Sequence, residues 1–200
     1  MDDPIPALYS DVHSYQELLH VNADFLRGKH AFTCYSVAPV QEETQPLVPT
    51  LLRLHSYGLY TMISQPGTKM PQDPQNQRSY IEFLCPETTA KLIFEDLYND
   101  SRVYTCRQLP RGGGVDENFP GRKLNLTQLE NGDESNNWWR DSLGGDIFYI
   151  VPGVERVDDI IRGLAVYSVV AREYGPETDC ATIVLHVAEK HIEQLEKYEV

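Results

Sequence analysis

The sequence predicts an α+β protein: a single domain with a mixed or antiparallel central sheet of about five or six strands and three main helices. Helical patterns alternate along the chain with short runs of β-branched and aromatic residues. The length of 200 residues suits one domain. A hydrophobic share of 41% and a charged share of 24% are typical of a globular chain with a buried core.

The first helix and strand are expected within the first forty or so residues. Residues 14–27 space their apolar side chains as a helix does. Ser14 and Glu17 occupy the positions of a capping box, and Gly28 follows as a stop signal. Residues 31–37 are rich in β-branched and aromatic side chains, which predicts a strand.

The next segment predicts a second helix and then a strand-helix-strand unit. Leu47, Leu51 and Leu54 lie on one helical face, with Pro46 suited to the first turn and Gly58 after the last. The elements expected after it are a strand at 59–64, a strand at 78–84, a helix at 87–100 and a strand at 102–109.

The last ninety residues change in composition. Residues 110–145 are rich in Gly, Asn, Asp and Glu, which predicts an irregular insertion anchored by Trp138 and Trp139. The elements expected after the insertion are a strand at 146–153, a helix at 157–175 and a final strand at 180–189.

The charge balance argues against two classes of partner. Lys and Arg total 17 against 30 Asp and Glu, a formal net charge of -13. A nucleic-acid surface needs clustered Lys and Arg, and an anionic membrane repels an acidic protein. The acidic, Pro-containing start does not resemble a secretory signal, and no apolar run reaches the roughly 20 residues of a spanning helix. We therefore expect a cytoplasmic protein.

No metal or organic cofactor is predicted. The four cysteines are far apart and form no CxxC pair, and the six histidines form no HxH or HExxH motif. The run at 111–114 lacks the GK[ST] ending of a phosphate loop. In a reducing compartment the cysteines are expected to be buried apolar side chains.

The loop between the strands at 59–64 and 78–84 carries the strongest polar pattern. Ser64 and Gln65 end the first strand, and Gln77 and Arg78 precede the second. If the two strands pair, these side chains meet at one sheet edge, where Gln and Arg can orient a carboxylate, a phosphate or another polar group. The alternative is a turn held by its own side chains, because Pro-Gly favours a type II turn.

The same stretch resembles an uncharacterised family of small bacterial proteins that is common in actinomycetes. The resemblance covers roughly residues 14–109 and implies a fold unit and a site, with no activity attached. It is carried by Glu43, Thr44, Pro46, Leu47, Gly58, Thr61, Ser64, Gln65, Pro66, Gly67, Gln77 and Arg78.

Two functions are open at this point. The first is a small enzyme that acts on a polar small molecule at the 64–78 loop. Its expected catalytic residues are Glu43, Ser64 and His55, and its expected substrate-binding residues are Thr61, Gln65, Gly67, Gln77 and Arg78. The second is a non-catalytic binding protein, of the inhibitor or immunity type, whose acidic surface meets a basic protein partner.

Overall fold

The computed structural model describes residues 8–34, 38–70, 73, 75–110, 113–120, 123–131, 133–139 and 155–200. Its helical elements are α2 (Tyr15–Leu26), η1 (Glu42–Leu47), α3 (Val48–Ser56), α4 (Glu87–Tyr98), α6 (Glu155–Arg162) and α7 (Cys180–Lys190). Its strands are β1 (Tyr60–Gln65), β2 (Gln75–Gln77), β3 (Tyr80–Cys85), β4 (Val103–Gln108), β5 (Val115–Glu117), β6 (Lys123–Leu129), β7 (Glu134–Trp139) and β8 (Ala165–Ala171).

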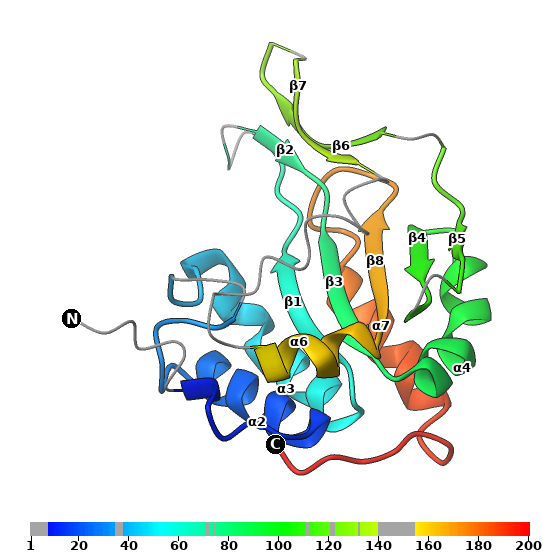
Figure 1. The fold of residues 1–200 in the computed structure, drawn as a ribbon. Coiled ribbons are helices and arrows are strands. Elements are labelled where there is room, and N and C mark those ends of the chain that lie inside the picture. Colours follow the sequence, from blue (N-terminus) through cyan, green and yellow to red (C-terminus); the bar gives the residue numbers. More distant parts are fainter. Residues whose placement is uncertain are drawn as a thin grey trace.

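The strands form two antiparallel sheets, which confirms the predicted α+β class. The larger sheet has the order β1-β3-β8-β4-β5, and the smaller has the order β2-β6-β7. Figure 1 shows the smaller sheet beyond one end of the larger one. β8 lies at the centre of the larger sheet, and β3 and β4 pair with its two sides.

Both faces of the larger sheet are covered. Helices α3, α4 and α7 pack on one face around Phe83 and Tyr167, whose rings stack 5.0 Å apart. Helices α2 and α6 and strand β6 contribute side chains to a second core on the other face, which includes Leu84 and Val166. Because β8 is enclosed from both sides, all seven of its residues are buried.

The N-terminal helix and the edge strand beside it were well predicted. Ser14 caps α2 by accepting a hydrogen bond from the backbone of Glu17, whose carboxylate accepts one from Ser14 in return. β1 pairs with β3 on one side only. On its free side, side chains take the place of a neighbouring strand: Asn22 donates to the Thr61 carbonyl, and His55 accepts from the Thr61 amide. These contacts block edge-to-edge pairing at Thr61.

The C-terminal assignments were wrong in two places. The expected helix at 157–175 is α6 followed by the strand β8, and the expected strand at 180–189 is the helix α7. A strand that is buried on both faces shows no polar alternation, so the apolar spacing of β8 imitates a helix. The start signal of α7 is Asp179, whose carboxylate accepts hydrogen bonds from the backbone of Ala181 and Thr182.

Two further predictions need correction. Residues 110–145 are not irregular throughout, because they contain β5, β6 and β7. In β6, Leu124 and Leu126 alternate with polar residues and are buried, which is the pattern of a strand with one core face. Residues 31–34 carry no strand, and the rest of the strand predicted at 31–37 lies outside the described residues, as does the strand predicted at 146–153.

The cap of α7 gives a first test of this fold. Asp179→Ala removes the acceptors for two backbone amides and for the Thr182 hydroxyl, which donates at 2.6 Å. We expect the free energy of unfolding to fall by about 1–2 kcal/mol. Urea unfolding followed by circular dichroism measures this loss. Asp179→Asn, which keeps one cap acceptor, should lose less, and equal losses would argue against the capping role.

Candidate functional site

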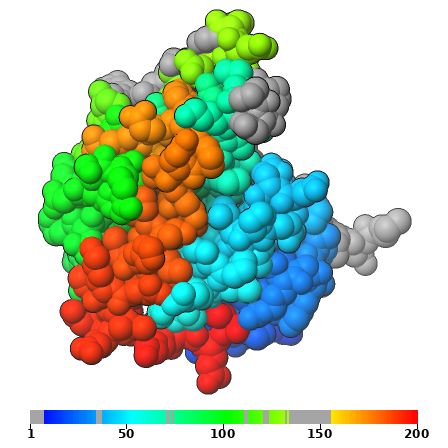
Figure 2. Space-filling view, turned by 180° about the vertical axis from the view of Figure 1, so that it is seen from behind, coloured from blue at the N-terminus to red at the C-terminus, as the bar shows by residue number. Residues whose placement is uncertain are grey.

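The Ser-Gln-Pro-Gly segment at the end of β1 lies against the loop that follows β8. A Cβ atom added at Gly67 would lie 1.8 Å from the carbonyl oxygen of Gly175, so only glycine fits there. The amide of Gly175 donates to the carbonyl of Gln77 at 3.0 Å. In the space-filling view the orange segment after β8 lies beside the blue-green segment around β2 (Figure 2). The segments around Gly67, Gln77 and Gly175 are therefore packed against one another.

The glutamines of the loop have partners within the chain. The Gln77 side chain donates to the carbonyl of Pro66 at 3.3 Å, and the Gln65 side chain donates to the carboxylate of Glu43 at 3.1 Å. The hydroxyl of Thr44 donates to the carbonyl of Ser64 at 3.2 Å. The sequence correctly indicated that these segments meet. Gly67 does not have the positive φ that a type II turn needs at this position, so the expected Pro-Gly turn is not formed. Only the bond from Gln77 to Pro66 lies within the loop, and the other two bonds hold the end of β1 to Glu43 and Thr44 of η1.

His55 lies in the core and not at the loop. It is fully buried, its ring stacks on Tyr60, and its Nε2 accepts a hydrogen bond from the Thr61 amide at 3.1 Å. Burial lowers the pKa of His55 to about 3, and the charge of Arg27 acts in the same direction. The imidazole is therefore neutral, with its proton on Nδ1. A general base needs access to a substrate, which the position of His55 does not provide.

Ser64 and Glu43 do not complete a catalytic set with this histidine. Ser64 lies three residues beyond Thr61, about 10 Å further along the strand. Glu43 is almost fully exposed, and hydrogen bonds from its own backbone and from Gln65 lower its pKa, so it is ionised at neutral pH. Glu43 and Ser64 therefore lie near each other where η1 meets the end of β1, whereas His55 is enclosed in the core.

Arg78 connects the two sheets. Its Nε donates to the carbonyl of Asn125 in β6 at 3.0 Å, and its Nη1 donates to the carbonyl of Ala171 in β8 at 3.0 Å. Its guanidinium carbon lies 4.1 Å from the centre of the Tyr174 ring. The side chain is half-buried and held in one orientation by these contacts.

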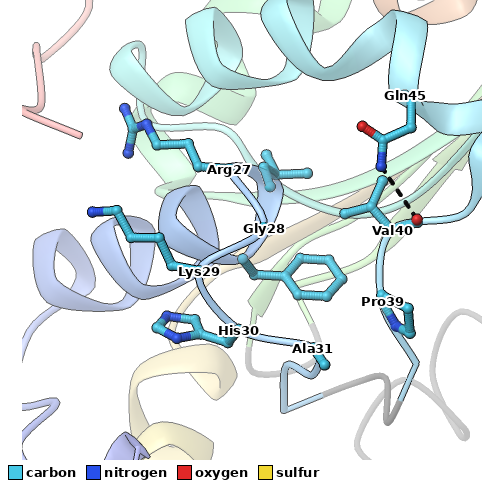
Figure 3. Close-up of a pocket in the computed structure, with 10 residues that line it drawn as sticks. Arg27, Gly28, Lys29, His30, Ala31, Pro39, Val40 and Gln45 are labelled. Carbon is cyan, nitrogen blue, oxygen red and sulfur yellow. Dashed lines mark hydrogen bonds between the residues drawn. The ribbon is translucent and has the colours of Figure 1, made fainter.

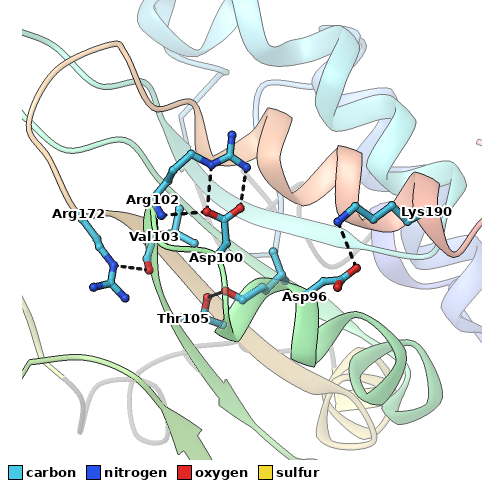
Figure 4. A network of polar contacts seen from close by, with 8 residues as sticks. Asp96, Asp100, Arg102, Val103, Thr105, Arg172 and Lys190 are labelled. Atoms are coloured by element: carbon cyan, nitrogen blue, oxygen red, sulfur yellow. Dashed lines mark hydrogen bonds and ion pairs between the residues drawn. The ribbon is translucent and has the colours of Figure 1, made fainter.

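A second arginine lies opposite Arg78. Tyr80 pairs with Val170, and the amide of Ala171 donates to the carbonyl of Ser79, so the next residues along the two chains are Arg78 and Arg172. Arg172 is half-buried and has the same type of environment. Its Nε donates to the carbonyl of Val103 at 3.0 Å, as Figure 4 shows, and its guanidinium carbon lies 4.6 Å from the centre of the Tyr104 ring.

These two arginines differ from most cations of the protein in having no carboxylate partner. In the described part of the chain, neither Arg78 nor Arg172 has a carboxylate within 4.0 Å. The cations that do have one are Arg27, Lys29, Arg53, Lys69, Lys91, Arg102, Arg107, Arg162 and Lys190. Arg156 and Lys197 also have no carboxylate partner among the described residues. The guanidinium groups of Arg78 and Arg172 are in addition each held by a backbone carbonyl and a tyrosine ring.

The arginine pair leaves donors available. Arg78 Nη2 and both terminal nitrogens of Arg172 have no acceptor among the described residues. Two fixed guanidinium groups with unused N–H donors can bind a carboxylate or a phosphate. Arg78 was predicted from the sequence, whereas Arg172 was missed because it fell in the second half of the helix predicted at 157–175, which is the strand β8 and the loop after it.

Other kinds of site find less support. Among the described residues, no three His, Cys, Asp or Glu side chains lie where they could together hold a metal ion. All four cysteines are free and buried. No helix in the described ranges combines the length and the apolar character that crossing a bilayer requires.

The chain matches a family model whose description names no activity. Residues 8–111 match the family model described as "Domain of unknown function (DUF6919)". The matched range includes β1, β3 and Arg78, whereas Arg172 and Tyr174 lie beyond it. No curated protein matches the sequence.

Proposed function

We propose that this chain, which belongs to the DUF6919 family, is a non-catalytic binding protein for a small polar molecule that carries a carboxylate or phosphate group. The anionic group would bind between Arg78 and Arg172, at the junction of the two sheets. This proposal keeps the polar ligand and the role of Arg78 that the sequence suggested. It moves the site from the two ends of the 64–78 loop, where Arg78 was expected beside Ser64 and Gln65, to the ends of β3 and β8.

The observation that carries the proposal is the pair of guanidinium groups without carboxylate partners. Each group is oriented by a backbone carbonyl and a tyrosine ring, so little side-chain entropy is lost when an anion binds. The remaining surface is acidic, with a net charge of -13, and repels anions elsewhere. Anion binding is therefore favoured at this junction over the rest of the surface.

Binding without catalysis is the better supported class. The expected nucleophile and base, Ser64 and His55, do not form a pair, and His55 is neutral and enclosed. Covalent catalysis needs a nucleophile within hydrogen-bond reach of its base. The described residues around Arg78 and Arg172 offer donors and aromatic rings, which recognise a ligand and do not transform it.

Titration with two anions tests the site. Sodium phosphate and sodium acetate are added at constant ionic strength, with sodium chloride as the reference, and the Nε–H signals of Arg78 and Arg172 are followed by NMR. We expect both signals to shift with phosphate, with a dissociation constant on the order of 1 mM. Arg172→Gln should weaken phosphate binding about tenfold, because a charged hydrogen bond is lost.

Arg102→Gln is the matched control. Arg102 directly precedes β4, and its carbonyl accepts a hydrogen bond from the Arg172 amide, but its guanidinium is already held by both carboxylate oxygens of Asp100 (Figure 4). Its loss should leave phosphate affinity within about twofold of wild type. The proposal fails if the two variants weaken binding equally, or if chloride shifts the Arg78 and Arg172 signals as much as phosphate does.

A further inference from the structure

The face of the larger sheet that carries the second core also carries a carboxylate. Side chains alternate along a strand, so Tyr80 and Leu84, which contribute to this core, place Glu82 on the same face. By the same rule Val170 places Ser168 there. The hydroxyl of Ser168 donates to the carboxylate of Glu82 at 2.7 Å, so both side chains point to this side of the sheet.

The carboxylate of Glu82 is held in one orientation and is still partly exposed. Ser168 is fully buried between Val166 and Val170, and a buried hydroxyl needs a hydrogen-bond partner. Glu82 provides that partner, although its own side chain is only half-buried. Burial raises the pKa of the Tyr80 phenol, and the charge of Glu82 acts in the same direction, as expected for neighbouring groups. Glu82 therefore places a negative charge at a defined position on this face.

Arg172 supplies the opposite charge further along the same face. Its guanidinium carbon lies 4.6 Å from the centre of the Tyr104 ring, and Tyr104 contributes to the second core. Tyr104 pairs with Val170, which lies midway between Arg172 and Ser168 along the chain. At the usual rise per residue of a strand, two to three residues separate the guanidinium from the Glu82 carboxylate by about 7–10 Å.

The two opposite charges do not neutralise each other. No described carboxylate, that of Glu82 included, lies within 4.0 Å of the Arg172 side-chain nitrogens. Each group is held by contacts of its own: Glu82 by the Ser168 hydroxyl, and Arg172 by the Val103 carbonyl and the Tyr104 ring. A molecule that carries both charges at a matching distance would complement both ends of this face.

We infer that this face of the sheet binds a zwitterion whose ammonium and carboxylate groups are several ångströms apart. The inference rests on the proposed function, because the carboxylate of the ligand occupies the anion site at Arg78 and Arg172. The ammonium group donates to the carboxylate of Glu82, and the chain between the two groups lies beside the rings of Tyr80 and Tyr104. An α-amino acid is too short, because both of its charged groups are attached to one carbon.

The cavity between the end of α2 and the start of η1 does not offer such a pair of charges (Figure 3). Its volume is about 400 Å³. The cations in its lining are already engaged: Arg27 contacts Asp24 and an oxygen of Val200, and Lys29 contacts Asp24. The signals of Val40, which also lines the cavity, therefore report whether a probe enters there instead.

Three probes with six-carbon chains test the inference on the full chain: 6-aminohexanoate, hexanoate and hexylamine. Binding is followed by the Nε–H signal of Arg172 and the ring signals of Tyr104. We expect 6-aminohexanoate to bind at least about tenfold more tightly than either other probe, because it makes charged hydrogen bonds at both ends. Equal affinity of 6-aminohexanoate and hexanoate would overturn the inference. Shifts at Val40 without shifts at Tyr104 would overturn the placement on the sheet.

A variant at Glu82 identifies the partner of the ammonium group. Glu82→Gln keeps an acceptor for the Ser168 hydroxyl and removes the charge, so 6-aminohexanoate affinity should fall about tenfold, to that of hexanoate. Glu173→Gln is the matched control, because it removes an exposed carboxylate next to Arg172 and should leave 6-aminohexanoate affinity within about twofold. Equal losses in the two variants would overturn the role of Glu82. If Glu82→Gln does not fold, the ranking of the three probes by the wild-type protein still decides.

Failure of this inference and failure of the proposed function give different results. If phosphate and hexanoate bind at Arg172 but 6-aminohexanoate binds no more tightly than hexanoate, only the inference is wrong. If neither phosphate nor hexanoate shifts the Arg172 signal, the proposed function is wrong and the inference with it. An affinity for 6-aminohexanoate that Arg172→Gln leaves unchanged would overturn the inference, because the ligand would then bind elsewhere.

Discussion

Gly67→Ala is expected to destabilise the protein by about 2–4 kcal/mol, because the new methyl group collides with backbone. The added Cβ would lie 1.8 Å from the carbonyl oxygen of Gly175 and 3.2 Å from the amide nitrogen of Ser79. Backbone atoms cannot rotate away from the clash as the end of a flexible side chain can. The loop after β8 must therefore move, and the hydrogen bond from Gly175 to Gln77 is lost with it.

Urea unfolding of Gly67→Ala and of a matched glycine variant measures this effect. Gly163→Ala is the control, since Gly163 also has an ordinary φ and its added Cβ comes no closer than 3.3 Å to any atom, the carbonyl oxygen of Ile160. Its cost should stay within about 1 kcal/mol. Equal stability of the two variants would show that the Gly67–Gly175 contact is absent. The same displacement should weaken phosphate binding, because Arg172 and Tyr174 lie in the moved segment.

The elements with local signals were predictable from the sequence. α2 carries its own capping box, and α4 and β4 have clear boundaries, so the predicted ranges of 14–27, 87–100 and 102–109 are nearly right. The strand β8 was predicted as part of a helix, because burial on both faces removes the polar alternation that distinguishes a strand. The helix α7 was predicted as a strand.

The candidate site was only half predictable, for a topological reason. β1 and β3 are close in sequence, so their pairing and the meeting of Gln65 with Glu43 could be inferred. Arg172 lies opposite Arg78 in the backbone register only because β8, which comes late in the chain, inserts between β3 and β4. No local pattern encodes that insertion. Arg172 could therefore not be identified as a site residue before the order of the strands was known.

His55 is expected to make the protein sensitive to mild acid. Its pKa is about 3 in the folded state and 6.5 as a free side chain. Between these values the unfolded chain binds a proton that the folded protein excludes, so the free energy of unfolding falls as the pH drops below about 6.5. The slope from this one residue is about 1.4 kcal/mol per pH unit. Above pH 6.5 the residue contributes no pH dependence.

The contribution of His55 to the pH dependence of stability can be isolated by replacing it with a residue that does not titrate. Urea midpoints are measured from pH 7.5 to pH 4.5 for wild type, for His55→Gln and for His186→Gln, which changes an exposed histidine of α7. His55→Gln lowers stability at pH 7.5, because the fit around Thr61 and Tyr60 is lost. Its stability should then fall less steeply with acid than that of wild type, by about 1 kcal/mol per pH unit.

The comparison of slopes decides between a core histidine and an accessible one. Carboxylates that titrate in this range are common to all three proteins, so their contribution cancels in the differences. His186→Gln should follow the wild-type curve. If His55→Gln also follows it, the imidazole is protonated in the folded protein and therefore reaches solvent. In that case His55 is again a candidate general acid or base beside Thr61, and the enzyme hypothesis regains support.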